Sequence, residues 1–282
     1  MSLRLLTAVV GMPLFIVLCA AGPLAFAWAL CVVAVVGLWE MSAASRRENV
    51  TPNPILCAMG LAGPALPLIL RFSEDLGRHG SETVMASLVV MVIAAMVMEV
   101  VVAYRTGVLN VTHRVGHGLL HGWYVSLFGG ISMLRTLPGP SGGMVPGMDT
   151  GQAVVMVVAL SIWAVDSAAL FVGKSMGHRK LAPKLSPGKT VEGSIGGLLA
   201  AILVGSIAGH IFLGSWTRGL VMGSISGTLG QFGDLFKSCL KREVGLKDFG
   251  VAMPGHGGVL DRFDSLLATG PAIWALIVLW PS

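Results

Sequence analysis

Long apolar runs recur along the whole of this chain, and they constrain its fold more than any other feature. A run of about 20 predominantly apolar residues can cross the hydrocarbon core of a bilayer as an α-helix. Only 12% of the 282 residues are charged and 54% are hydrophobic, whereas soluble domains carry about 25% charged residues. We therefore expect an all-α polytopic membrane protein. About nine transmembrane helices are predicted, at residues 3–20, 23–40, 54–71, 83–104, 118–134, 151–173, 193–213, 216–236 and 264–280.

The distribution of Lys and Arg predicts the orientation of these helices, because cytoplasmic loops are enriched in both residues. Of the 19 Lys and Arg residues, all but Arg71, Arg78, Arg135 and Arg218 fall on the side that holds the N-terminus. We therefore expect the N-terminus to be cytoplasmic. Residues 1–22 resemble a secretory signal peptide, but further apolar runs follow, so we expect this segment to be retained as the first helix.

Polar residues divide the chain into two parts. Residues 1–150 are mostly apolar helix with short loops, and we interpret them as a scaffold of transmembrane helices. Residues 151–282 include two basic segments, 174–189 and 237–262, and we interpret them as a transmembrane catalytic region. The four cysteines form no C-x-x-C pair, so they indicate neither a metal site nor a disulfide.

Two short motifs suggest chemistry that the rest of the chain does not support. Residues 173–175 and 188–190 read Gly-Lys-Ser and Gly-Lys-Thr, but both lack the first glycine of a phosphate-binding loop. His113, His117 and His121 are spaced to share one helical face. The glycines between these histidines favour a basic interfacial segment over a metal site.

Three groups of polar residues converge on the predicted cytoplasmic side of the C-terminal part. Ionisable groups at membrane depth are costly, and they mark a site that faces the bundle interior or water. The first group is Asp166, about two turns before its predicted span ends. The second is the LSPGKTVEG segment at 185–193, and the third runs from Asp234 to Ser265.

Spacing within the third group predicts a site for phosphate and metal. Asp261 and Asp264 lie three residues apart, so both carboxylates would face one ion. Residues 254–258 read PGHGG, and glycines let backbone N–H groups approach an anion closely. Mg²⁺ prefers one or two carboxylates together with phosphate oxygens. One face of the preceding helix would carry Asp234, Ser238, Lys241 and Arg242.

Each feature taken singly also has a purely structural explanation. Glu192 would complement the dipole at a helix N-terminus. The basic residues between 237 and 247 would form an ordinary cytoplasmic loop beside anionic lipid, and Asp261 with Arg262 would be a local ion pair. The combination favours a site, because a loop that only sets topology needs neither aspartates inside helices nor PGHGG.

The pattern S-x-x-K-R-x4-K-D-x-G-x3-P-G-H-G-G-x-x-D-R-x-D-S runs from Ser238 to Ser265. It resembles the signature of the phosphatidate cytidylyltransferases, also called CDP-diacylglycerol synthases. Segments 181–193 and 231–238 are similar to flanking parts of the same family. The resemblance implies a reaction of phospholipid biosynthesis, in which CMP passes from CTP to phosphatidic acid with Mg²⁺ as cofactor. The products would be CDP-diacylglycerol and pyrophosphate.

The resemblance also implies roles for single residues. Asp234 and Asp261 would bind Mg²⁺, with room near them for a second cation, a monovalent one among the options. The residues expected to act in catalysis are Asp166, Lys189, Glu192, Lys241, Arg242, Lys247, His256, Arg262 and Asp264. Those expected to bind substrate are Ser186, Thr190, Ser238, Gly257 and Gly258. Leu170 and Val191 depart from the family, whose members often carry an aromatic residue and a Trp there.

The expected partners are CTP, phosphatidic acid and the lipid bilayer, with no nucleic acid and with room for a homodimer. We expect a protein of the bacterial inner (plasma) membrane whose active site faces the cytoplasm. Two alternatives stay open at this point. A secondary transporter would also place carboxylates at membrane depth, although it would be expected to show repeats. An intramembrane aspartyl protease would use only Asp166 and Asp234. A CDP-alcohol phosphotransferase would need D-G-x-x-A-R, which the chain lacks.

Overall fold

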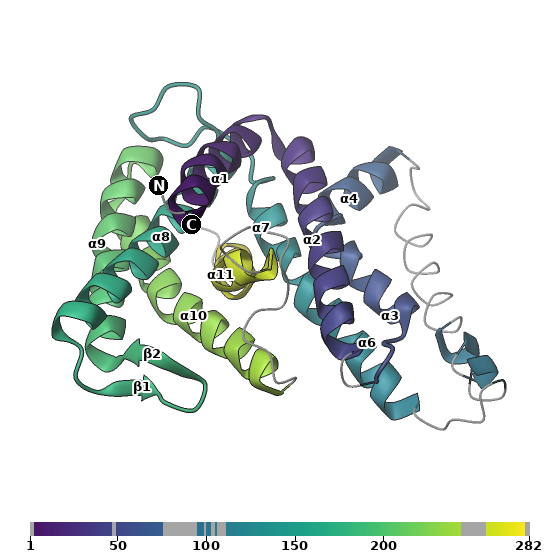
Figure 1. The fold of residues 1–282 in the computed structure, drawn as a ribbon. Coiled ribbons are helices and arrows are strands. Elements are labelled where there is room, and N and C mark those ends of the chain that lie inside the picture. Colours follow the sequence, from purple (N-terminus) through teal and green to yellow (C-terminus); the bar gives the residue numbers. More distant parts are fainter. Residues whose placement is uncertain are drawn as a thin grey trace.

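The computed structural model describes residues 3–46, 49–75, 95–98, 100–102, 105, 111–243 and 258–279. Within these residues the chain is almost entirely helical, as predicted, with one two-stranded antiparallel hairpin (Figure 1). The N-terminal helices are α1 (Leu3–Ala20), α2 (Pro23–Arg46), α3 (Pro54–Met59), the 3-10 helix η1 (Gly60–Ala62), α4 (Leu66–Asp75), α6 (Val111–Ser126) and α7 (Phe128–Leu134). The C-terminal elements are α8 (Thr150–Met176), β1 (Lys180–Ala182), β2 (Ser186–Thr190), α9 (Val191–Leu213), α10 (Trp216–Glu243) and α11 (Leu260–Leu279).

Four of these helices, α2, α8, α9 and α11, are long and apolar enough to cross a membrane. Each coincides with a run that the sequence predicts as a span. Such helices are characteristic of an integral membrane protein. The total of about nine spans and the cytoplasmic N-terminus stay predictions, and most of the predicted span at 83–104 lies outside the described residues.

The predicted span at 54–71 is interrupted, and it forms α3, η1 and α4 in place of one helix. Gly60 and Gly63 lie so close to α6 that a β-carbon on either would be 2.1 Å from a backbone oxygen of that helix. The predicted span at 118–134 is likewise divided between α6 and α7. Short helices in backbone contact therefore stand where the sequence predicts continuous spans.

Helices α8, α9 and α10 lie side by side, and the hairpin lies at one end of this group (Figure 1). Small residues let α9 and α10 approach closely. A β-carbon on Gly209 of α9 would be 2.3 Å from the Cα of Gly219 on α10. The hairpin joins α8 to α9, so this packing holds its second strand near the C-terminal half of α10.

Helix α11 packs against α10 on one side and against α7 on the other. A β-carbon on Gly233 of α10 would be 2.6 Å from the backbone oxygen of Asp264, and one on Gly130 of α7 would be 2.2 Å from the backbone nitrogen of Pro271. The first turns of α11 are thereby held against α10. The division of the chain at residue 150 stays a prediction, and α7 of the first part contacts α11 of the second.

The three predicted in-line histidines lie on α6. The hydroxyl of Ser45 on α2 is 2.9 Å from Nδ1 of His117 and 3.1 Å from Nε2 of His121. These hydrogen bonds join α6 to the end of α2, so two of the three histidines have a structural contact.

Candidate active site

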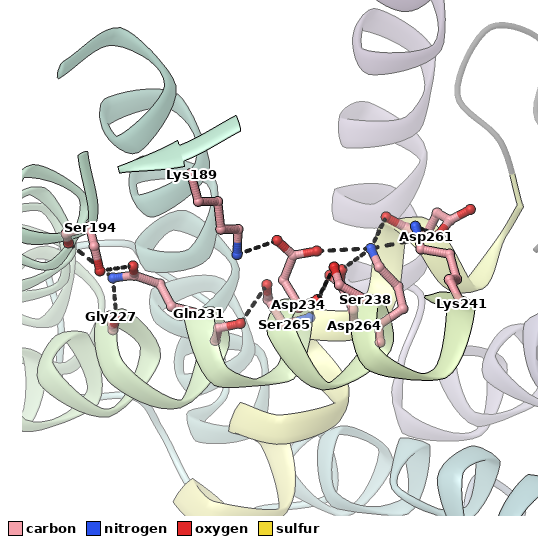
Figure 2. A network of polar contacts seen from close by, with 12 residues as sticks. Lys189, Ser194, Gly227, Gln231, Asp234, Ser238, Lys241, Asp261, Asp264 and Ser265 are labelled. Carbon is pink, nitrogen blue, oxygen red and sulfur yellow. Dashed lines mark hydrogen bonds and ion pairs between the residues drawn. The ribbon is translucent and has the colours of Figure 1, made fainter. Parts of the chain in front are cut away.

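Three carboxylates from two helices converge on one lysine. The Nζ of Lys237 on α10 lies 3.1 Å from Oδ1 of Asp234 and 3.6 Å from Oδ1 of Asp261, and it also contacts Oδ2 of Asp264 (Figure 2). Asp234 lies one turn before Lys237 on α10, whereas Asp261 and Asp264 lie in the first turns of α11. Burying such charges is costly unless each has a partner of opposite sign. The contact between α10 and α11 supplies these partners.

Two further lysines extend this network at its ends. Lys189 at the end of β2 pairs with Oδ2 of Asp234, and the Nζ of Lys241 lies 3.0 Å from Oδ1 of Asp261. We call the six residues the polar cluster: Lys189, Asp234, Lys237, Lys241, Asp261 and Asp264. Its three positive and three negative formal charges cancel. The cluster joins the hairpin, α10 and α11.

One end of the polar cluster is open and the other is closed. The side chains of Lys189 and Asp234 are 26% and 31% exposed, whereas those of Lys237 and Asp261 are 6% and 4% exposed. Asp166 on α8 is also exposed, and its carboxylate interacts electrostatically with Asp234 and Lys189 at the open end. A ligand would therefore meet the Lys189–Asp234 end first.

The hairpin presents Lys189 through two local contacts. The hydroxyl of Thr190 accepts a hydrogen bond from the backbone N–H of Gly193 at 3.1 Å and caps α9. The carboxylate of Glu192 accepts hydrogen bonds from the backbone N–H groups of His178 and Arg179, at 3.1 and 3.2 Å. Both side chains thus fix the turn that carries Lys189. Glu192 therefore has structural contacts outside its own helix, and its predicted role in catalysis stays a prediction.

Arg242, Ser238 and Ser186 lie around this region with different surroundings. Nε of Arg242 donates a hydrogen bond to the backbone oxygen of Leu185 at 3.3 Å and links α10 to the hairpin loop. The hydroxyl of Ser238 donates to the backbone oxygen of Asp234 in its own helix, at 2.8 Å. Ser186 is the first residue of β2, paired with β1, and it is partly buried. Their predicted roles toward substrate stay predictions.

The start of α11 holds the remaining predicted residues that the structure describes. Arg262 is exposed, and its guanidinium interacts electrostatically with the carboxylate of Asp166. Oδ2 of Asp261 accepts a hydrogen bond from the backbone N–H of Gly258 at 3.0 Å. Gly258 does allow a close approach to an anion, but that anion is the carboxylate of Glu40, 2.6 Å from where a β-carbon would lie. The predicted residues outside the described part of the chain are Lys247, His256 and Gly257.

The match to known proteins extends over the whole chain. Residues 2–280 match the family model described as the cytidylyltransferase family. The chain belongs to the cytidylyltransferase family. This membership confirms the resemblance that the motif between Ser238 and Ser265 indicates.

Three curated relatives of this cytidylyltransferase chain carry the name phosphatidate cytidylyltransferase. The protein from Bacillus subtilis is 41% identical over 138 residues, which are 46% of this chain and 49% of the relative. The protein from Rickettsia felis is 36% identical over 58% of this chain and 79% of its own length. The protein from Staphylococcus saprophyticus is 29% identical over 99% of both chains. The alignment thus spans about half of the first relative and nearly all of the third.

Lys237 and Glu40 contact the predicted site residues of the cytidylyltransferase chain, although the motifs of the sequence do not predict a role for either. The sequence indicates only that Lys237 is a basic residue of a cytoplasmic loop. Its position three residues after Asp234, however, predicts an ion pair on one helical face. Glu40 is fully buried in α2, and its carboxylate accepts hydrogen bonds from the backbone at the start of α11. A lone carboxylate inside an apolar span is the signal that could have identified Glu40.

The donor chemistry of the polar cluster suits Mg²⁺. Among the residues that the structure describes, no three His, Cys, Asp or Glu side chains are arranged to hold a metal by themselves. Asp234, Asp261 and Asp264 surround the ammonium of Lys237 instead. Carboxylate oxygens are ligands that Mg²⁺ prefers, and Mg²⁺ commonly takes its other ligands from substrate phosphates and water. The three aspartates are therefore suited to bind Mg²⁺ that is also coordinated by the phosphates of a nucleotide.

Proposed function

We propose that the protein is a phosphatidate cytidylyltransferase, which transfers CMP from CTP to phosphatidic acid and forms CDP-diacylglycerol and pyrophosphate. The observation that carries this proposal is the polar cluster, where three lysines and three aspartates from the hairpin, α10 and α11 meet within a membrane protein. Family membership and the names of the relatives support the same activity. A soluble nucleotide and a lipid phosphate would meet at this cluster.

The reaction needs no protein nucleophile, because the phosphate of phosphatidic acid is already anionic. One of its oxygens would form a bond to the α-phosphorus of CTP. The bond between that phosphorus and the oxygen bridging to the β-phosphate would break, and pyrophosphate would leave with the electron pair. Catalysis of such transfers rests mainly on positioning the reactants and on stabilising negative charge.

The open end of the polar cluster would bind the phosphates first. Among the described residues, Lys189 and Arg262 are accessible cations near that end, and Lys241 lies deeper. Asp234 and Asp261 would hold Mg²⁺, with Asp264 adjacent, and the bound ion would neutralise charge on the polyphosphate. Lys237 would keep the three carboxylates together before the nucleotide arrives.

The polar cluster favours this function over the two alternatives from the sequence. Aspartyl proteases work with two carboxylates that share a proton. Asp234 is instead paired with Lys189 and Lys237, an arrangement that suits an anionic substrate. Nothing in the described part of the chain specifically favours a transporter.

The location of the protein completes the proposal. We place the active site at the cytoplasmic face of a bacterial inner membrane, with the N-terminus in the cytoplasm and about nine spans in all. The clustering of Lys and Arg on one side supports this orientation. CTP would enter from the cytoplasm and phosphatidic acid from the adjacent leaflet.

The position of the transferred label tests this proposal. Purified protein in detergent micelles would receive phosphatidic acid, Mg²⁺ and CTP labelled at either the α- or the γ-phosphorus. We expect α-label in the lipid fraction and γ-label in released pyrophosphate, with both products lost when phosphatidic acid is omitted or EDTA is added. Transfer of γ-label to lipid would indicate a kinase instead. Failure of folded protein to form any product would overturn the proposed function.

A further inference from the structure

A cavity lies beside α2, away from the polar cluster. The cavity has a volume of about 420 Å³, and its walls come from α2, α3, η1, the segment before α3 and the first turn of α6. In Figure 1 the chain returns past α2 through α3 and α4, so the cavity lies between segments that run in opposite directions. Nothing in the proposed reaction uses this cavity.

The lining of this cavity is polar at one end and apolar at the other. Arg46 at the end of α2 and Thr51 just after it lie at the polar end. Val35 and Leu38, two to three turns earlier on α2, line the apolar end, together with Leu61 of η1. Eleven residues separate Val35 from Arg46, or about 16 Å along a helix. This is roughly half of the 30 Å hydrocarbon core of a bilayer, so the lining on α2 is about as long as one leaflet is deep.

The polar end of the cavity carries positive charge. Arg114, only 9% exposed, donates a hydrogen bond to the hydroxyl of Thr51, so one guanidinium is already held in the wall. Arg46 is exposed at the same end. The described residues that line the cavity include these two arginines and no Asp or Glu. A guanidinium recognises phosphate oxygens through several N–H donors at once.

The cavity and the catalytic helix α11 lie on opposite faces of α2. Gly37 and Glu40 of α2 contact the start of α11. Leu38 and Ser42, which line the cavity, are four residues apart and share the other face of the helix. A molecule in the cavity is therefore separated from the polar cluster by α2 itself.

We propose that this cavity binds an anionic phospholipid, with its phosphate at Arg46, Arg114 and Thr51 and one acyl chain along Val35, Leu38 and Leu61. The arginines supply charge complementarity, and the distance of about 16 Å from Arg46 to Val35 would place an acyl chain below a phosphate within one leaflet. Because α2 separates the cavity from the polar cluster, the bound lipid would be a surface-bound lipid that does not take part in the reaction.

Native mass spectrometry of the purified full chain tests this inference, with dioleoyl phosphatidylglycerol as the probe. Phosphatidylcholine serves as the neutral lipid and inorganic phosphate as a competitor without acyl chains. Replacing both arginines, Arg46→Ala with Arg114→Ala, is expected to weaken phosphatidylglycerol binding about 30-fold. Arg218→Ala, which removes an exposed arginine at the start of α10, is the matched control and should bind as the wild type does.

Two single variants keep the test decisive if the double variant fails to fold. Arg46→Ala removes only an exposed side chain, and Ala58→Phe fills the apolar end from an exposed lining position. Both should weaken phosphatidylglycerol binding without a loss of folded protein. Equal binding of phosphatidylcholine, unchanged binding in Arg46→Ala, or displacement of the lipid by inorganic phosphate would each overturn the inference. The readout is binding and not turnover, so it stays interpretable if the proposed function fails.

Discussion

Replacing Lys237 with Met is expected to destabilise the protein by about 3–5 kcal/mol, because it leaves buried carboxylates without their shared cation. Asp234, Asp261 and Asp264 all converge on this ammonium. Lys189 and Lys241 would still pair with one carboxylate each, but Asp264 would lose its contact with the ammonium of Lys237. We expect turnover to be lost along with stability.

Unfolding of purified protein in mixed micelles, followed against increasing SDS, measures this effect. Lys174→Met is the matched control, since Lys174 is exposed at the end of α8, and it should change stability little. Lys237→Arg keeps the charge and should recover much of the stability. A Lys237→Met protein as stable as the wild type would show that the three carboxylates do not depend on this lysine.

Removing the carboxylate of Glu40 is expected to reduce turnover strongly, although Glu40 lies outside the polar cluster. Its oxygens accept hydrogen bonds from the backbone N–H groups of Val259 and Leu260, at 2.9 and 3.3 Å. The first N–H groups of a helix have no partner within the helix, and a negative charge there is favourable. Glu40 thereby holds the start of α11, one residue before Asp261. It is a positioning residue.

Glu40→Ala leaves two buried N–H groups without acceptors, at a cost of about 1–3 kcal/mol each. We expect kcat per folded molecule to fall at least about tenfold, which corresponds to a shift of 1.4 kcal/mol in the barrier. Glu40→Gln keeps one acceptor oxygen and should be intermediate. The measurement is kcat normalised to the folded fraction.

A double-mutant cycle with Gly258→Ala separates positioning from a general loss of stability. In the wild type, the added β-carbon would lie 2.6 Å from Oε2 of Glu40, so Gly258→Ala alone should be harmful. In the Glu40→Ala background that clash is gone, and the second substitution should cost much less. Neighbouring residues couple by about 0.5–3 kcal/mol in such cycles. Additive effects on kcat would contradict the contact between Glu40 and Gly258.

The sequence predicts the long helices well, because their apolar runs are themselves the driving force for insertion. The ends of α8 and α9 lie within a few residues of the predicted spans. The breaks near Gly60 and between α6 and α7 were not predictable in this way. They depend on backbone contacts between segments distant in the chain, as between Gly60 and Gly122. The hydrophobicity of a run does not predict such contacts.

The site was predictable where its geometry is local. Asp234 and Lys241 share a helical face by spacing alone. In the polar cluster Lys241 pairs directly with Asp261, and Asp234 contacts the same lysine, Lys237, as Asp261 does. The role of Glu40 is not predictable from local spacing, because its partner Val259 lies 219 residues away. The role of Lys237 is not predictable either, because a lysine near a predicted cytoplasmic loop also has an ordinary role in topology.

We propose that the polar cluster is the catalytic centre for transfer of CMP to phosphatidic acid. The most direct test compares the wild type with Asp261→Asn in micelles that contain phosphatidic acid, α-labelled CTP and Mg²⁺. Asn preserves the shape of Asp261 and one acceptor oxygen, so the fold should persist. Asp149→Asn is the control, since Asp149 pairs with Arg135 outside the cluster at 2.7 Å.

We expect lipid-soluble label from the wild type and from Asp149→Asn. For folded Asp261→Asn we expect a loss of activity of at least about 100-fold, the scale seen when one group that stabilises charge in a transition state is removed. Full activity in folded Asp261→Asn would contradict the assignment of the catalytic centre to the polar cluster.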